Sequence, residues 1–154
     1  MTDNERIIRH LYEVAEVQDS AAFVKLFADD GYFYDVSAGA KYYGQDIGKT
    51  VDIYATAFPD MHRELGNFYV TDDTIIVELS LNGTHKGPLV IPAGTIAPTN
   101  QRIQAPCCDV FKLKDGKVEF FHCYTAATIL FAQLGILGNI GAVLQPHDGA
   151  GNAS

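Results

Sequence analysis

The sequence is poor in residues that build covalent or metal-bound frameworks. It has no tryptophan and only three cysteines, of which Cys107 and Cys108 are adjacent and Cys123 stands apart. An odd number of cysteines without a C-x-x-C pair argues against a disulfide framework and a zinc site. The histidines also lack metal-ligand spacing, and no phosphate-cradling loop occurs. We therefore expect free thiols and independence from metals and organic cofactors.

Basic residues are scarce as well. Eleven Lys and Arg residues stand against nineteen Asp and Glu residues, which gives a formal net charge of −8, and the acids are scattered along the chain. Such a surface repels phosphate backbones and anionic lipids. The composition therefore argues against nucleic acid and membranes as partners.

Long apolar runs are absent too. The sequence opens with the polar run MTDNER, contains no apolar segment long enough to span a bilayer, and shows no signal-peptide pattern. Cytoplasmic residence is the expectation that follows.

No internal repeat or low-complexity segment divides the chain. Its 154 residues are 47% hydrophobic, and one core is typical of chains of roughly 100–200 residues. The small and polar run QPHDGAGNAS closes the sequence. We predict a single domain over residues 1–145 and a flexible tail over residues 146–154.

The first sixty residues have mainly helical patterns. Thr2 and Glu5 form a capping box ahead of apolar residues at helical spacing. Asp19 is a suitable cap for a second, short helix within residues 20–30. A third helix is predicted from about Gly44 to Pro59. Between the second and third helices, the aromatic and glycine-rich residues 31–44 predict a short strand followed by a loop.

The pattern changes to strands after Met61. Alternating apolar residues predict strands within residues 62–73, 74–87, 101–114 and 117–124, the last two joined by a tight turn at Asp115-Gly116. Three prolines make residues 88–100 a predicted loop over one end of the sheet. A final helical segment follows residue 124. Helices first and a meandering sheet after them indicate an α+β domain.

Four segments carry a family resemblance. AFPDMHREL, LNGTHKGPL, APTNQRIQAPCCDVFKLKDGKV and FAQLGIL resemble, in this order and at these separations, the SnoaL-like polyketide cyclase and ester cyclase group of the nuclear transport factor 2-like superfamily. The resemblance covers about residues 5–140. It implies a cone-shaped, curved, mixed sheet packed on N-terminal helices, a dimer formed through the outer sheet face, an apolar pocket, and no metal or cofactor. Members include cyclases, isomerases, dehydratases, epoxide hydrolases and binding proteins, so the fold does not fix the reaction.

The residues that the resemblance aligns with known catalytic groups depart from the family patterns. Aligned on the D-G-K turn, Cys123 takes the place of the aldol cyclases' catalytic Asp, and Asp109 takes the place of their His. A related subgroup has H-x-Y-x-D on this strand. His122 and Tyr124 match that pattern, whereas Ala126 replaces its Asp.

The comparison with ketosteroid isomerase leaves one matching position of three. Asp35 falls where that enzyme has its general base, but Leu11 and Pro106 stand where its oxyanion-hole Tyr and acid would be. Loss of a single oxyanion donor typically lowers the rate ~100- to 1,000-fold.

These comparisons leave a set of candidates expected to meet in the cone. The candidate catalytic residues are Asp35, Asp109, His122 and Tyr124. The candidate pocket walls are Tyr12, Tyr34, Tyr54, Phe58 and Cys123.

The orientation of the last strand is ambiguous in the sequence. Counting from an apolar Val118, strict alternation turns His122 and Tyr124 inward and Cys123 outward, whereas the cyclase alignment requires Cys123 inward. A β-bulge would reconcile the two. A structural role is open for several candidates as well: Asp35 as acceptor for the following loop, Asp109 at a subunit interface, and Cys123 as a small buried hydrophobe.

Two functions follow as hypotheses. The first is an enzyme that takes a small, largely apolar molecule, such as one bearing a carbonyl, and performs cofactor-independent cyclisation or isomerisation, with Asp35 or Asp109 as base and His122 and Tyr124 as proton donors. The second is a non-catalytic ligand-binding or interaction domain. A hydrogen bond between His122 and a carboxylate would favour the enzyme. Because a lone cone would expose apolar residues on its outer sheet face, we also expect a homodimer.

Overall fold

The computed structural model describes residues 1–138 and 143–144. The predicted tail over residues 146–154 lies outside the described residues. In chain order the elements are α1 (Asp3–Glu16), α2 (Ser20–Lys25), β1 (Phe27–Asp35), β2 (Ala40–Tyr43), the 3-10 helix η1 (Gly44–Gly48), α3 (Lys49–Ala57), β3 (His62–Val70), β4 (Thr74–Thr84), β5 (Leu89–Ile91), β6 (Gly94–Ile96), β7 (Arg102–Lys114), β8 (Lys117–Thr125) and α4 (Ala127–Leu134).

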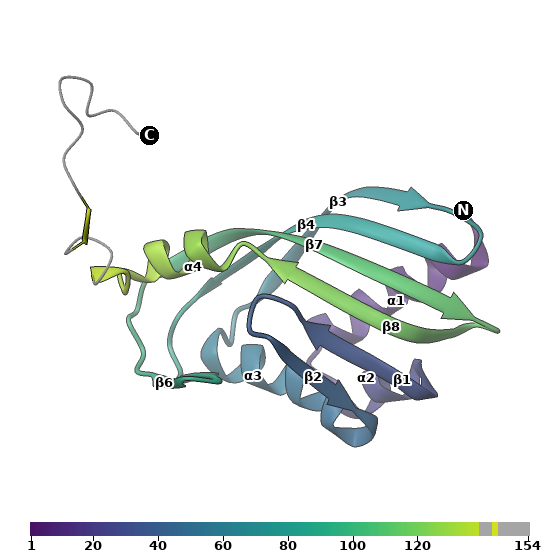
Figure 1. The fold of residues 1–154 in the computed structure, drawn as a ribbon, viewed down its shortest axis with the longest axis horizontal. Helices are drawn as coiled ribbons and strands as arrows, with labels where there is room; N and C mark the ends of the chain where they lie inside the picture. Colours follow the sequence, from purple (N-terminus) through teal and green to yellow (C-terminus); the bar gives the residue numbers. More distant parts are fainter. Residues whose placement is uncertain (139–142, 145–154) are drawn as a thin grey trace.

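Six strands form one curved sheet in the order β2-β1-β8-β7-β4-β3. Strands β1 and β8 are parallel and the other neighbours are antiparallel, so the sheet is mixed. Figure 1 shows the sheet curving over α1, α2 and α3, with α4 and the β5–β6 hairpin at one end. The predicted α+β fold, with a curved mixed sheet packed on N-terminal helices, is confirmed.

Several local signals work as the sequence predicts. The Thr2 hydroxyl accepts a hydrogen bond from the Glu5 backbone N–H at 3.1 Å, and α1 starts at the next residue after Thr2. The Asp19 carboxylate likewise caps α2. Asp115 and Gly116 have φ angles of 52° and 75°, which is the left-handed region that a tight hairpin turn between β7 and β8 requires.

Three predictions about the bounds or the type of a segment were wrong in part. The second helix ends at Lys25, because Phe27 already pairs with Val118 in the sheet, and strand pairing outweighs the local helical pattern. The predicted loop within residues 31–44 contains β2. The predicted loop over residues 88–100 contains the β5–β6 hairpin, whose strands avoid the three prolines of this segment.

The core lies between the helices and the concave face of the sheet. Helix α1 buries Ile8, Leu11 and Tyr12 against it, and β4 buries alternate residues such as Ile75 and Val77. Alternation on a pleated strand sends every second side chain to the same face, so one set of residues forms the core.

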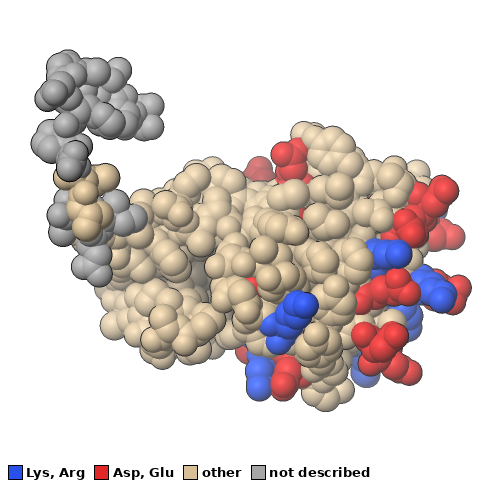
Figure 2. All heavy atoms as spheres, in the orientation of Figure 1, with Lys and Arg blue, Asp and Glu red and all other residues tan. Residues whose placement is uncertain are grey.

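Charged side chains are distributed unevenly. In Figure 2 the acidic and basic side chains gather on the half of the visible face away from α4, and the end around α4 is nearly free of charge. The segments 88–100 and 126–138 at that end contain no Asp, Glu, Lys or Arg. Among the helices of the described residues, none has the length and hydropathy of a bilayer-spanning segment.

Candidate functional site

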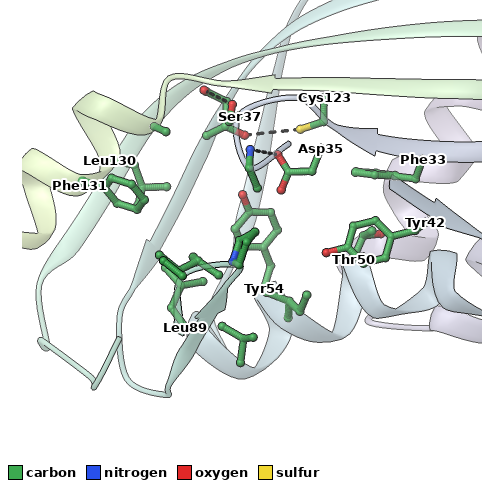
Figure 3. Close-up of a pocket in the computed structure, with 18 residues that line it drawn as sticks. Phe33, Asp35, Ser37, Tyr42, Thr50, Tyr54, Leu89, Cys123, Leu130 and Phe131 are labelled. Carbon is green, nitrogen blue, oxygen red and sulfur yellow. Dashed lines mark hydrogen bonds between the residues drawn. The ribbon is translucent and has the colours of Figure 1, made fainter. Parts of the chain in front are cut away.

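A cavity of about 430 Å³ opens at the end of the sheet between α3, α4 and the β5–β6 hairpin (Figure 3). Strands β1 and β8 contribute Phe33, Asp35 and Cys123 to its wall, and α3 contributes Tyr54. Apolar residues close the other sides: Ile53, Leu89, Val90, Ile91, Leu130 and Phe131. The volume falls within the range of small-molecule sites, which are mostly apolar with a few polar groups.

Three residues in register cross the concave face of the sheet. Asp35 of β1 pairs with Cys123 of β8, and Cys123 pairs with Asp109 of β7. We call Asp35, Cys123 and Asp109 the concave row. Two carboxyl groups and a thiol therefore face the same side of the sheet as the core and the cavity.

Asp35 is half-buried in the wall of the cavity. Burial raises the pKa of its carboxyl above the ordinary 3.8, while hydrogen bonds from the backbone N–H groups of Ala38 and Ser37 act in the opposite direction. The Ala38 contact measures 3.3 Å. The loop-accepting role that the sequence leaves open for Asp35 is therefore real, yet the same carboxyl also lines the cavity.

Tyr54 extends from α3 with its hydroxyl directed toward Asp35 in Figure 3. Burial raises its pKa well above 10.0, and the neighbouring Cys123 and Asp35 add to the shift. The phenol therefore keeps its proton at neutral pH and can donate a hydrogen bond to a bound molecule. Further hydroxyls line the same cavity, from Ser37, Tyr42, Thr50 and Thr125.

Asp109 lies deeper, with only 2% of its surface exposed. Burial raises its pKa from 3.8 to about 6, although hydrogen bonds from Tyr12, Cys107 and Cys123 lower it. The Tyr12 hydroxyl donates to Asp109 Oδ2 at 2.6 Å. A small cavity of about 40 Å³ adjoins this pair and shares Tyr54 and Cys123 with the larger cavity. Asp109 therefore faces the interior, and the interface position considered from the sequence does not apply.

The other three candidates of β1 and β8 lie on the convex face, and they are Tyr34, His122 and Tyr124. Tyr34, His122 and Val110 are neighbours in register, and we call them the convex row. The His122 ring stacks on Phe120 at a centroid distance of 4.1 Å, and its Nε2 lies 2.9 Å from the Tyr32 hydroxyl. Tyr124, on the same face, is 46% exposed. The prediction that Tyr34, His122 and Tyr124 line the pocket was wrong.

A register shift in β8 explains the error. Lys112 pairs with Phe120 but Leu113 pairs with Val118, so Glu119 is an extra residue on β8. Alternation counted from Val118 is reversed beyond this bulge, which turns Phe121 and Cys123 inward. The β-bulge that would reconcile the two orientations is therefore present.

The remaining predicted walls divide between the cavities and the core. Tyr54 and Cys123 line the larger cavity, and Tyr12 lines the smaller one. Phe58 is fully buried and packs on His85 at a ring distance of 5.4 Å, so its prediction as a pocket wall was wrong. His85 is itself buried, with Thr99 bonded to its Nδ1, which fits a structural part.

Sequence reasoning missed several residues of the site. The β5–β6 hairpin supplies Leu89, Val90 and Ile91, and α4 supplies Phe131. The sequence did contain one indication of these residues. Segments 88–100 and 126–138 have no charged residue and many apolar ones, a composition that suits the mouth of an apolar pocket. Sequence spacing also hid one group of potential metal ligands: Cys107, Asp109 and Cys123 place their ligand atoms within 4.8 Å of one another.

Several solved structures have a similar fold. A proposed SnoaL-like polyketide cyclase from Jannaschia sp. CCS1 has a TM-score of 0.76 at 18% identity, with 86% of this chain and 92% of that chain covered. IdmH, a proposed polyketide cyclase from Streptomyces antibioticus, has a TM-score of 0.72 at 19% identity, over 87% and 99% of the two chains.

A third structure, a protein with a ketosteroid isomerase-like fold from Catenulispora acidiphila in complex with trimethylamine, has a TM-score of 0.70 at 18% identity, with coverages of 84% and 92%. These likenesses show the fold.

None of the curated proteins matches this sequence. The SnoaL-like domain family matches residues 8–120, which is well over half of the sequence. The chain therefore belongs to the SnoaL-like family.

Proposed function

We propose that this protein binds a small, uncharged, largely apolar carbonyl compound in the 430 Å³ cavity and catalyses proton transfer at the carbon next to the carbonyl, leading to cyclisation or isomerisation without a cofactor. The observation that carries the proposal is the Asp35 carboxyl, which lies in an apolar cavity that raises its pKa. A carboxylate with a raised pKa is a stronger base, and catalytic bases work best when their pKa approaches the working pH.

The lining disfavours an anionic ligand. Among the described residues that line the cavity, Asp35 is the only charged one. A ligand carboxylate or phosphate would lose its hydration there without gaining a cationic partner, and it would meet the negative charge of Asp35. A neutral ketone loses little by entering and gains from burial of its apolar surface.

The polar groups of the wall have distinct parts in the proposed reaction. The Asp35 carboxylate takes a proton from the carbon beside the carbonyl, and the developing negative charge moves to the carbonyl oxygen. The Tyr54 hydroxyl, which keeps its proton because burial raises its pKa, donates a hydrogen bond to that oxygen. In a β,γ-unsaturated ketone, return of the proton from Asp35 to the γ-carbon moves the double bond and gives isomerisation. Attack of the enolate on a second carbonyl of the same molecule gives cyclisation, and the alkoxide that forms takes the proton back from Asp35.

Asp35 is preferred to Asp109 as the base. Asp109 lines only the small inner cavity, behind Cys123, and its Oδ2 already accepts the Tyr12 hydrogen bond. It has no direct place on the larger cavity. Asp109 instead maintains, with Tyr12, the polar interior end of the site.

The similar structures support this reaction class. Two of them are proposed polyketide cyclases, and the third has a ketosteroid isomerase-like fold.

A non-catalytic binding protein of the same fold is the second candidate, and one observation favours it. His122, expected to be a proton donor, lies on the convex face with Tyr32 as its hydrogen-bond partner rather than a carboxylate. The enzyme proposal therefore depends on Asp35 and Tyr54 alone.

We also propose a homodimer formed through the convex face. Two exposed aromatic residues lie on this face, Tyr43 at 57% and Tyr124 at 46% exposure. The Tyr43 ring packs on Tyr32, which in turn packs on Phe120 and His122. Aromatic residues are enriched in protein interfaces. Cytoplasmic residence stays a prediction from the sequence.

Deuterium incorporation tests the function without knowledge of the final product. The protein is incubated in D₂O with a panel of neutral cyclic and polycyclic ketones, each paired with a carboxylate-bearing analogue, and exchange beside the carbonyl is followed by NMR. Saturation-transfer NMR measures binding separately. We expect binding and enzyme-dependent exchange for neutral members only. Binding without exchange would support the second candidate, and equal binding of the carboxylates would contradict the proposed ligand class.

A further inference from the structure

Two thiols and a carboxyl converge at the inner end of the site. Cys107 Sγ lies 3.6 Å from Cys123 Sγ and 3.3 Å from Asp109 Oδ1. All three side chains are buried, and they come from the neighbouring strands β7 and β8. The proposed proton transfer at Asp35 uses neither Cys107 nor this convergence.

The spacing of the three atoms resembles that of ligands around a tetrahedral metal ion. With Zn–S bonds of about 2.3 Å, two sulfurs at the tetrahedral angle lie roughly 3.8 Å apart, and a sulfur and a carboxylate oxygen lie roughly 3.5 Å apart. The observed 3.6 Å and 3.3 Å differ from these values by about 0.2 Å. The third separation, between Cys123 Sγ and the Asp109 carboxylate, lies within 4.8 Å, so side-chain rotations of Cys123 or Asp109 would bring all three atoms onto one ion.

The surroundings also suit an ion. The 40 Å³ cavity is lined by all three groups, and Cys123 also lines the larger cavity, which gives a path for entry and a direction for a fourth ligand. The Tyr12 hydroxyl holds the other oxygen of Asp109, which is the outer-shell support that metal-binding carboxylates commonly have.

The charge at the cluster would balance. Two thiolates and a carboxylate carry three negative charges, a divalent cation supplies two positive charges, and Arg63, which lines the same small cavity, supplies one more. Arg63 also acts electrostatically on the Asp109 carboxyl. A buried site with a near-zero total charge avoids most of the penalty of isolated ions.

We propose that Cys107, Asp109 and Cys123 form a site for a thiophilic divalent cation of the Zn²⁺ or Cd²⁺ class, with three protein ligands and a fourth position directed toward the ligand cavity. Three protein ligands with an open fourth position are typical of zinc sites that bind exchangeable molecules. The expectation of no metal rested on sequence spacing, which does not show that residues 107, 109 and 123 meet across two strands. The site is independent of the proposed function, which needs no metal.

Binding needs no oxidant or reductant. The cation displaces the two thiol protons, and that of Asp109 where it is protonated, and these protons pass to solvent. Affinity should therefore increase with pH. Hard cations such as Mg²⁺ prefer all-oxygen sites and should not compete.

Titration of the full-length, reduced protein with Cd²⁺ tests the site, with thiolate-to-metal absorption in the ultraviolet as the readout. We expect one ion per chain, unaffected by excess Mg²⁺. Cys107→Ser and Cys123→Ser should each weaken binding at least ~100-fold, above the range typical of outer-shell changes. Cys108→Ser is the matched control, because Cys108 is on the opposite face of β7, and it should bind as the wild type does.

Circular dichroism identifies any variant that fails to fold, and Asp109→Asn then provides a variant that keeps both thiols but loses the oxygen ligand. We expect Asp109→Asn to bind Cd²⁺ more weakly while retaining thiolate absorption. No saturable absorption in the wild type, or an equal loss in Cys108→Ser and Cys107→Ser, would overturn the proposal. Because the readout is metal binding, its failure leaves the proton-transfer proposal unaffected.

Discussion

The concave and convex rows are one residue apart in sequence, yet the sheet places their polar groups in different surroundings. Asp35, Cys123 and Asp109 face the core and cavities, where burial raises the pKa of both carboxyls. Tyr34 and His122 face outward, where the His122 ring meets Tyr34 edge-on, stacks on Phe120 and pairs with the Tyr32 hydroxyl.

The difference shows where this protein can do chemistry. Perturbed carboxyls beside a cavity are typical of functional sites, whereas stacked aromatic side chains on a sheet face are typical of contact surfaces. The concave row is thus the proposed catalytic wall and the convex row is the proposed subunit interface.

The largest effect is expected at Asp35. Asp35→Asn keeps the shape of the side chain but removes the base, so exchange beside the ligand carbonyl should fall by ~100- to 10,000-fold. His122 precedes Cys123, the partner of Asp35 in register, and lies on the convex face. His122→Ala should therefore leave the exchange rate unchanged. A loss of exchange in His122→Ala with full activity in Asp35→Asn would reverse the assignment of the two faces.

The bulge in β8 can be tested by stability. Phe121 packs on Phe111 and Phe33 at ring distances of 4.2 and 4.4 Å, so Phe121→Ala should lower the free energy of unfolding by ~3–5 kcal/mol. Tyr124→Ala on the opposite face should change it by less than ~1 kcal/mol in the monomer. Urea unfolding compares the two. Equal losses would show that β8 does not alternate as described.

Asp109 should make stability depend on pH. Its pKa is about 6 in the folded protein against 3.8 as the ordinary value, so the folded state holds this proton more tightly than the unfolded state. The resulting stabilisation is complete below about pH 4 and is lost as the pH rises through 6, on the order of 3 kcal/mol.

Asp109→Asn cannot titrate, so its stability should lack this fall when urea unfolding is measured from pH 4 to 7. The comparison is made as the difference between variant and wild type, because other groups titrate equally in both. Parallel pH curves for the two proteins would contradict a raised pKa at Asp109.

The smallest effect concerns self-association. Light scattering should give about twice the 16.8 kDa mass of one chain. Tyr124→Glu places like charges opposite each other at the proposed interface and should weaken the dimer about tenfold or more. Val90→Glu, at an exposed position beside the cavity, is the control and should leave the mass unchanged. A monomeric wild type would refute the dimer.

The sequence predicts the fold better than the site. Capping residues, the Asp115-Gly116 turn and strand alternation are local signals, and each of them gave the correct element. The orientation of His122 and Cys123 depends on one extra residue, Glu119, whose bulge forms through pairing with β7. Alternation within β8 alone could not show it. The same limit hid the contact between Cys107 and Cys123, which are diagonal neighbours across two strands.

The pH profile of deuterium exchange tests the central claim most directly. For the best neutral ketone, we expect kcat/KM to rise with pH through one ionisation above the ordinary 3.8 of a carboxyl and then to level off, because Asp35 must lose its proton to act as the base. The same ionisation should disappear from the residual exchange of Asp35→Asn. A profile that is unchanged in Asp35→Asn would contradict the claim that the concave row supplies the base.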